Sequence, residues 1–101
     1  MSRFLVTYHG GSGAPASAEQ AEQMKAAFGR WLAGAGSAVV DPGAPLRPAT
    51  QVANGSPLPR VAIGGYTIIE AADAAAAMEI LRTHPFVARG GTLQVDEAAS
   101  I

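Results

Sequence analysis

Alternation of bulky and polar residues predicts two strong strands. The first runs from Arg3 to Tyr8, with Phe4 and Val6 on the same face as Tyr8. The second runs from Arg60 to Glu70 and carries apolar residues on both faces. A strand that is apolar on both faces needs cover on both sides of its sheet.

Two stretches with apolar residues at helical spacing predict two helices. The first begins at a capping box, Ser17–Gln20, and ends at Gly34 and Gly36. The second covers Ala72 to Thr83, and the His84-Pro85 pair stops it because a residue before proline avoids helical geometry. Four apolar residues of the second helix are expected to face the sheet, namely Ala74, Ala77, Met78 and Leu81.

Weaker signals complete the chain. A short strand is expected from Ser37 to Asp41, followed by a proline-broken segment that belongs at a sheet edge or in a loop. Asn54-Gly55 is a turn signal and makes this region a long hairpin. Gly64-Gly65 indicates a bulge or a close backbone approach, and a last strand is expected from Thr92 to Val95.

The order of these elements is βα, a β-hairpin and then αβ. That order predicts one domain, residues 1–101, with the fold of a ferredoxin-like α+β sandwich, βαββαβ, built on an antiparallel sheet. Two helices normally cover only one face of a four-stranded sheet. The other face is most simply covered by a second copy of the chain, so a homodimer is expected.

Composition narrows the classes of partner. Hydrophobic residues make up 49% of the 101 residues and charged residues only 15%, which favours burial of part of the surface against a partner. The net charge is −1 and the basic residues are scattered, so a nucleic-acid-binding face is not supported. The chain contains no cysteine, which excludes disulfides and thiolate chemistry. No leader or membrane-spanning run is recognised, and a cytoplasmic protein without a membrane partner is expected.

Several segments together resemble a known family. They are YHGG (residues 8–11), WLAGAGSAVVDPGAPL (31–46), GGYTIIEA (64–71) and LRTHPFVARGGTLQV (81–95). The chain is similar in these segments to the YCII-related domain family, in its DGPF-like branch. The resemblance implies a dimeric α+β barrel in which two sheets close face to face. It implies little about chemistry, because the biochemical role of the family is largely unassigned.

The better-known branch of that family is proposed to be enzymatic through a histidine and aspartate pair. Its histidine corresponds to a position near Lys25, and its aspartate corresponds to His84. This chain therefore lacks the pair, and the activity proposed for that branch does not carry over.

Candidate catalytic residues are His9, His84 and Asp41. The two histidines are the only ones in the chain, and each ends an element, where acid–base chemistry or ligand contact is feasible. The resembling branch also carries Tyr-His at the first of these positions. Asp41 is able to orient a histidine or hold a polar group, although a turn role is the simpler interpretation. Candidate ligand-binding residues are Tyr66, Arg30 and Arg82.

Other types of site receive less support from the sequence. Residues 11–16 fit the pattern G-x-G-x-x-A, but Pro15 removes an amide that should face a pyrophosphate, and the chain is too short for the usual parallel sheet. No ligand spacing for a metal and no nucleophile elbow is present. No metal or cofactor is therefore predicted.

Three hypotheses about function remain open. In the first, the protein binds a small polar or anionic molecule in a pocket between sheet and helices, with acid–base chemistry by histidine if it is an enzyme. In the second, it is a protein-interaction or regulatory module, because the resembling branch occurs fused to sigma-factor regions and this links it to transcription control. In the third, it is a degenerate copy that keeps only the dimeric fold.

Overall fold

The computed structural model describes residues 1–11 and 15–100, which form an α+β fold with a four-stranded antiparallel sheet and, within these residues, three α-helices. In chain order the elements are β1 (Ser2–Gly10), α1 (Ala18–Ala35), the 3-10 turn η1 (Gly36–Ala38), β2 (Val39–Pro45), β3 (Gly65–Ala71), α2 (Ala74–Leu81), α3 (Pro85–Ala88) and β4 (Gly91–Glu97).

The strand order in the sheet is β2-β3-β1-β4, so the first strand of the chain lies in the middle. Phe4 pairs with Ile69 of β3, and Tyr8 pairs with Leu93 of β4. Successive side chains of a strand point to opposite faces. These pairs therefore fix which residues of the neighbouring strands share a face with the apolar side of β1.

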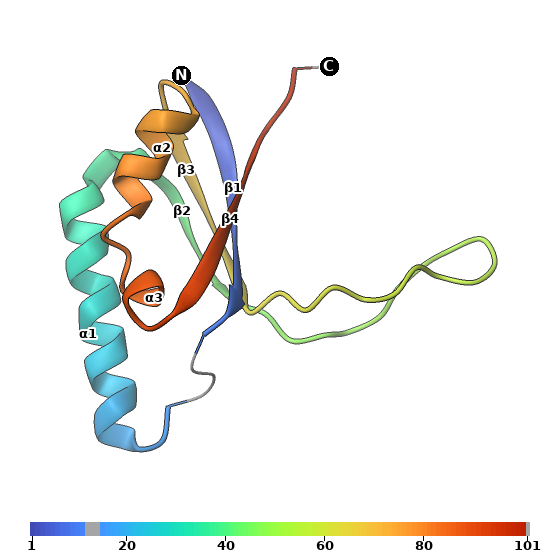
Figure 1. Ribbon diagram of the computed structural model, residues 1–101, viewed down its shortest axis with the longest axis horizontal. Helices are drawn as coiled ribbons and strands as arrows, with labels where there is room; N and C mark the ends of the chain where they lie inside the picture. The colour runs from blue at the N-terminus through green and yellow to red at the C-terminus, as the bar shows by residue number, and fades with distance from the viewer. Residues whose placement is uncertain (12–14, 101) are drawn as a thin grey trace.

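The helices cover one face of the sheet, as Figure 1 shows with the helices to the left of the strands. The buried core between the two layers consists of Phe4, Val6, Trp31, Ile69, Ala71, Ala77 and Leu81. This confirms the predicted inward face of the first strand. It also places the apolar stripe of α1 against the sheet, because Phe28 and Leu32 pack on the same core.

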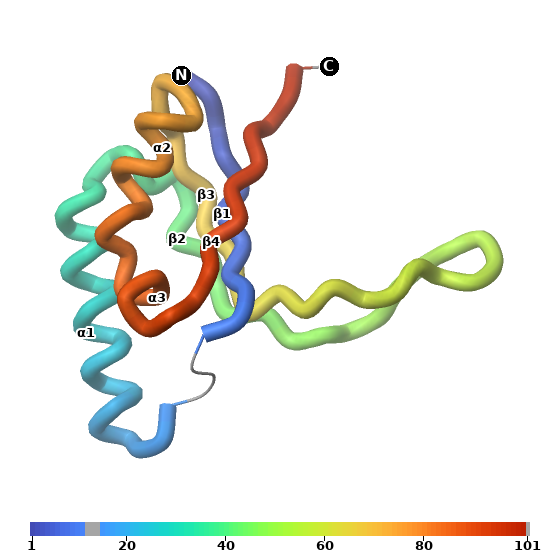
Figure 2. Tube along the Cα trace, viewed as in Figure 1, coloured from blue at the N-terminus to red at the C-terminus, as the bar shows by residue number. Residues whose placement is uncertain are grey.

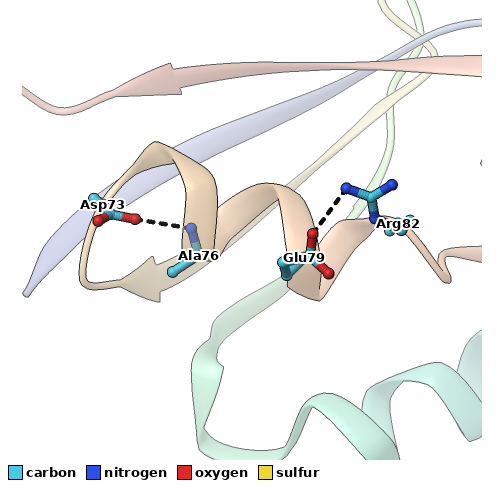
Figure 3. Close-up of polar contacts among 4 residues, drawn as sticks. All are labelled: Asp73, Ala76, Glu79 and Arg82. Atoms are coloured by element: carbon cyan, nitrogen blue, oxygen red, sulfur yellow. Dashed lines mark hydrogen bonds and ion pairs between the residues drawn. The ribbon is translucent and has the colours of Figure 1, made fainter.

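Side-chain caps start the two longer helices. Ser17 Oγ accepts a hydrogen bond from the Gln20 amide at 3.0 Å, as the capping box predicts. Asp73 Oδ1 accepts one from the Ala76 amide at 2.8 Å and begins α2 (Figure 3). Each cap satisfies a backbone N–H that has no partner within its helix.

The other face of the sheet has no helix over it among the described residues. Leu5 is 42% exposed there, and its neighbour across the strand pair, Ile68, is only partly buried. We call this surface the open face. Its apolar centre is the feature of the monomer that the expected second copy would cover.

Residues 46–64 form an arm that leaves the end of the sheet and projects away from the helices (Figure 1). Figure 2 traces it as two neighbouring lengths of chain joined by a turn near Asn54-Gly55. The hairpin expected there is present, but the strand predicted from Arg60 begins only at Gly65. Residues 61–63 are apolar, but they lie beyond the ends of the neighbouring strands, and of this segment Gly64 still bonds to β1, through the Tyr8 carbonyl.

The second helix also differs from its prediction. It covers Ala74–Leu81 and ends before Thr83, and a separate short helix, α3, begins at Pro85. Proline at the first position of a helix loses no hydrogen bond, so His84-Pro85 starts a helix where we expected only a stop. Ala77 and Leu81 face the sheet as predicted, but Ala74 is exposed and Met78 is 55% exposed, so the prediction is wrong for these two.

Strand β2 starts later and runs further than predicted, from Val39 to Pro45. It contains two prolines and lies at the edge of the sheet, as prolines require. The register with β3 shifts on both sides of Asp41. At Gly65 a Cβ atom would lie 3.0 Å from the Ala44 carbonyl oxygen, which confirms the close backbone approach predicted there.

Three residues of the G-x-G-x-x-A pattern, 12–14, lie outside the described residues, while Ser17 caps a helix that begins only after the pattern. Among the described residues, every helix is too short or too polar to cross a membrane.

Candidate functional site

His84 lies in the connection between α2 and α3 and is almost completely buried, with 2% of its surface exposed. Its backbone is extended, as expected before proline, with ψ of 133°. The ring caps α3, because Nδ1 accepts a hydrogen bond from the Phe86 amide at 3.0 Å. Local sequence thus turns this histidine inward and fixes one of its two ring nitrogens.

Aromatic rings surround the His84 imidazole on the helix side of the sheet. The Trp31 ring centroid lies 4.5 Å away, that of Tyr8 5.2 Å and that of Phe28 5.7 Å. The Trp31 indole N–H donates to the Ile80 carbonyl at 3.2 Å, which fixes that ring between α1 and α2. These rings exclude water from the imidazole over most of its surface.

A chain of hydrogen bonds runs from His84 across the sheet. His84 Nε2 lies 2.9 Å from the Tyr8 hydroxyl, which lies 2.7 Å from Thr67 Oγ1. Thr67 donates to the Pro42 carbonyl at 3.0 Å.

The direction of this chain follows from its ends. Nδ1 of His84 accepts from an amide, so the proton of the neutral ring sits on Nε2 and is donated to Tyr8. Thr67 uses its own proton on a carbonyl, so it accepts from the Tyr8 hydroxyl. Every group is satisfied, and no buried polar side-chain atom of the described residues lacks a partner.

Burial holds both ionisable groups of this chain in their neutral forms. It lowers the pKa of His84 to about 4, and the nearby Arg89 guanidinium acts in the same direction. Burial also raises the pKa of Tyr8, although the hydrogen bond with Thr67 and the charge of Arg89 oppose that change. At neutral pH the imidazole is therefore uncharged and the phenol keeps its proton.

A cavity of about 600 Å³ adjoins this network at the end of the sheet from which the arm leaves. Met24 and Phe28 of α1 line one wall, and residues 42–46 of β2 and the arm root line another. Tyr8, His84 and Phe86 close the interior side. We call this cavity the helix-side pocket.

Arg89 is the only charged side chain among the described residues that line the helix-side pocket. Its guanidinium carbon lies 5.7 Å from the centroid of the Phe86 ring, which positions the cation by a cation–π contact. The remaining lining is largely apolar. An arginine beside a largely apolar cavity suits an anion that also carries an apolar body.

His9, the other histidine, points to the open face. Its Nε2 lies 2.8 Å from Thr7 Oγ1, two residues earlier on the same face of β1. Because side chains alternate along a strand and Tyr8 points to His84, His9 and His84 lie on opposite faces of the sheet. The structure does not bring the two candidate histidines into one pocket.

Asp41 and Tyr66 do meet, at the open face, and Tyr66 is also among the residues that line the helix-side pocket at the end of the sheet. The Tyr66 hydroxyl donates to Asp41 Oδ2 over a long distance of 3.4 Å. The other carboxylate oxygen accepts from the Gly43 amide at 2.9 Å, an Asx-turn contact typical of the simpler role considered for this aspartate. Gly43 itself has φ of +75°, and an added Cβ would collide with the Tyr66 carbonyl.

The two candidate arginines lie on the helix surface away from the helix-side pocket. Arg30 is exposed and borders a groove between α1 and α2. Arg82 pairs with Glu79 at 2.8 Å (Figure 3), and both side chains are largely exposed. Such a solvent-screened pair contributes little to stability.

The sequence pattern did not identify three residues of the site, namely Tyr8, Thr67 and Arg89. Alternation along β1 placed Tyr8 on the core face, but nothing in the sequence linked its hydroxyl to the histidine. Arg89 appeared as one of several scattered arginines, and only the fold turns it toward a cavity.

No protein-family model matches this chain, and a comparison with curated proteins finds no matching relative. Within residues 1–11 and 15–100, no three histidine, aspartate or glutamate side chains lie close enough together to hold a metal ion. The site is therefore interpreted from its own geometry.

Proposed function

We propose that the protein binds a small anion with an apolar body, such as a carboxylate on an aromatic or aliphatic group, in the helix-side pocket. The observation that carries the proposal is the position of Arg89 as the single charged side chain, among the described residues, in a lining that is otherwise uncharged and largely apolar. A carboxylate would pair with the guanidinium, and the apolar body would contact Met24 and Phe28.

The Tyr8–His84 network serves this site as a wall. Both ring nitrogens of His84 are occupied by hydrogen bonds, and its low pKa keeps it uncharged at neutral pH. It adds no competing cation and holds the Tyr8 hydroxyl in place. The proposal is accordingly one of binding, and His9 and Asp41 on the open face take no part in it.

We further propose that the fold is ferredoxin-like and that two copies form a dimeric α+β barrel of the YCII-related, DGPF-like kind. The strand order β2-β3-β1-β4 supports the ferredoxin-like arrangement. Leu5 and Ile68 on the open face support the dimeric barrel, because a partner sheet would remove their apolar surface from water.

A second candidate function is that of a protein-interaction module, including one linked to sigma-factor transcription control. The observation that favours it is the arm, in which Val52 is 96% exposed and Leu58 83% exposed. In that case the helix-side pocket would be an incidental cavity.

Thermal-shift measurements with benzoate and with its uncharged analogue benzamide test the first proposal. Benzoate is expected to raise the melting temperature more than benzamide does, and Arg89→Gln should abolish the difference. Arg30→Gln removes a charge of the same type from the surface groove and should leave the difference between benzoate and benzamide unchanged. Equal responses of the wild type and Arg89→Gln would remove the support for the pocket.

A further inference from the structure

The arm touches the body of the molecule only at its root. The Leu46 amide donates to the Gly64 carbonyl at 3.0 Å, and the Gly64 amide donates to the Tyr8 carbonyl at 2.7 Å. Beyond the root the two halves of the arm bond to each other, through Gln51 to the Leu58 carbonyl and Arg60 to the Thr50 carbonyl, both at 2.9 Å. The arm is thus held together internally and is exposed along its whole length.

Most of the large exposed apolar side chains outside the open face belong to two surfaces. One is the arm, where Val52, Leu58 and Val61 are 96%, 83% and 68% exposed. The other is a groove between α2 and β4, which has a volume of about 620 Å³. We call it the β4 groove, and its exposed apolar residues are Met78, Val87 and Val95, at 55%, 41% and 37%.

These two surfaces of one chain cannot meet each other. The β4 groove opens on the helix side of the sheet, since α2 and α3 contribute to it. The arm projects to the opposite side (Figure 1). A second copy packed on the open face lies on the same side of the sheet as the arm. The arm therefore projects toward the surface of that copy.

The reach of the arm fits such a second copy. Extended chain spans about 3.3 Å per residue, so each half of roughly nine residues reaches about 30 Å. A sheet stacked on the open face lies about 10 Å away, and its helix layer lies roughly another 10 Å beyond. The arm is therefore long enough to pass the partner's sheet and lie beside its helices.

The strand order, together with the direction of the two-fold axis, sets which edge of the second copy the arm meets. In each copy the arm leaves from β2 and β3, at one edge of the order β2-β3-β1-β4. The proposed dimer is taken to have its two-fold axis between the sheets and parallel to the strands, which reverses that order in one copy relative to the other. In that arrangement each β2 edge lies over the partner's β4 edge, beside the β4 groove.

We propose that the arm of each copy seats its apolar side chains in the β4 groove of a second copy of this chain. The exchange is reciprocal, so the dimer contains two arm–groove contacts. Each contact buries an arm surface and a groove surface that are exposed to water in the single chain. This inference rests on the proposed dimer and adds the identity of the two surfaces that hold it together.

Cysteine cross-linking tests the proposal without background, because the chain has no cysteine of its own. One chain carries Val52→Cys, Leu58→Cys or Val61→Cys, one position at a time, and a second chain with a different tag carries Met78→Cys. The chains are mixed, allowed to exchange and oxidised, and the mixed disulfide is measured. Three arm positions are used because a disulfide requires Cα atoms about 4.4–6.8 Å apart.

The matched control replaces Met78→Cys by Lys25→Cys, an exposed residue of α1 that is outside the β4 groove. At least one arm position should give the mixed disulfide with Met78→Cys about tenfold more than with Lys25→Cys, because seated surfaces share a high effective concentration. Equal yields from a protein that sediments as a dimer would overturn the arm placement and leave the dimer standing. A wild type that sediments as a monomer would overturn both.

Discussion

The Tyr8 hydroxyl lies 2.9 Å from Nε2 of His84, although the two residues are 76 positions apart in the chain. This contact ties the central strand to the connection between α2 and α3, at the inner wall of the helix-side pocket. Because both partners are neutral, with His84 buried and Tyr8 partly buried, their hydrogen bonds contribute to stability as well as to the shape of the pocket.

Removal of the Tyr8 hydroxyl should destabilise the protein. Tyr8→Phe leaves the His84 Nε2 proton without an acceptor in a buried site, at a cost of about 1–3 kcal/mol in the free energy of unfolding. Tyr66→Phe is the control, since it removes only the 3.4 Å bond to Asp41 and should change that free energy by about 0.5 kcal/mol or less. Urea denaturation measures the free energy of unfolding of both variants. A loss in Tyr8→Phe as small as that in Tyr66→Phe would show that the network contributes nothing to stability.

His84 should make stability depend on pH between about 4 and 6.5. Its pKa is about 4 in the folded protein against 6.5 ordinarily, so in this range the unfolded chain binds more protons. Stability should therefore fall as the pH falls from 6.5 toward 4, by up to about 3 kcal/mol. His84→Gln should lack this part of the slope, whereas His9→Gln should keep it. A wild-type slope that survives in His84→Gln would assign it to other groups.

Two glycines should respond in opposite ways to alanine. At Gly43, φ is +75° and a Cβ would collide with the Tyr66 carbonyl oxygen, so Gly43→Ala should cost about 2 kcal/mol or more and disturb the pocket wall. At Gly34, in α1, a Cβ meets open space, and Gly34→Ala should stabilise by about 0.5–1 kcal/mol. Thermal unfolding of the two variants checks the signs, and a destabilised Gly34→Ala would contradict the account of α1.

The sequence carried enough information to place most elements of the fold. Alternation in β1, the capping box at Ser17 and the prolines of an edge strand are local signals, and each appears in the structure as expected. The predicted start of β3 at residue 60 was wrong, because an apolar segment forms a strand only where a neighbouring strand is available to pair with it. That neighbour depends on where the adjacent strands end.

The site was harder to predict than the fold, for a physical reason. Sequence reasoning placed His84 at the end of a helix and Tyr8 on the core face, yet their contact arises only when the sheet and the helix layer pack. Arg89 acquires its position in the same way, because the pocket that it faces is assembled from distant segments. His9 and His84 share a residue type but lie on opposite faces of the sheet.

Methionine NMR tests the central claim, that the helix-side pocket binds an anion, most directly. The chain has three methionines, and they occupy different places: Met24 lines the pocket, Met78 lies in the β4 groove and Met1 is exposed. With 13C-methyl labelling, benzoate should shift the Met24 signal progressively and leave that of Met78 unchanged, and Arg89→Gln should remove the shift. A Met24 signal that stays fixed while benzoate saturates the protein, or one that shifts equally in Arg89→Gln, would contradict the account.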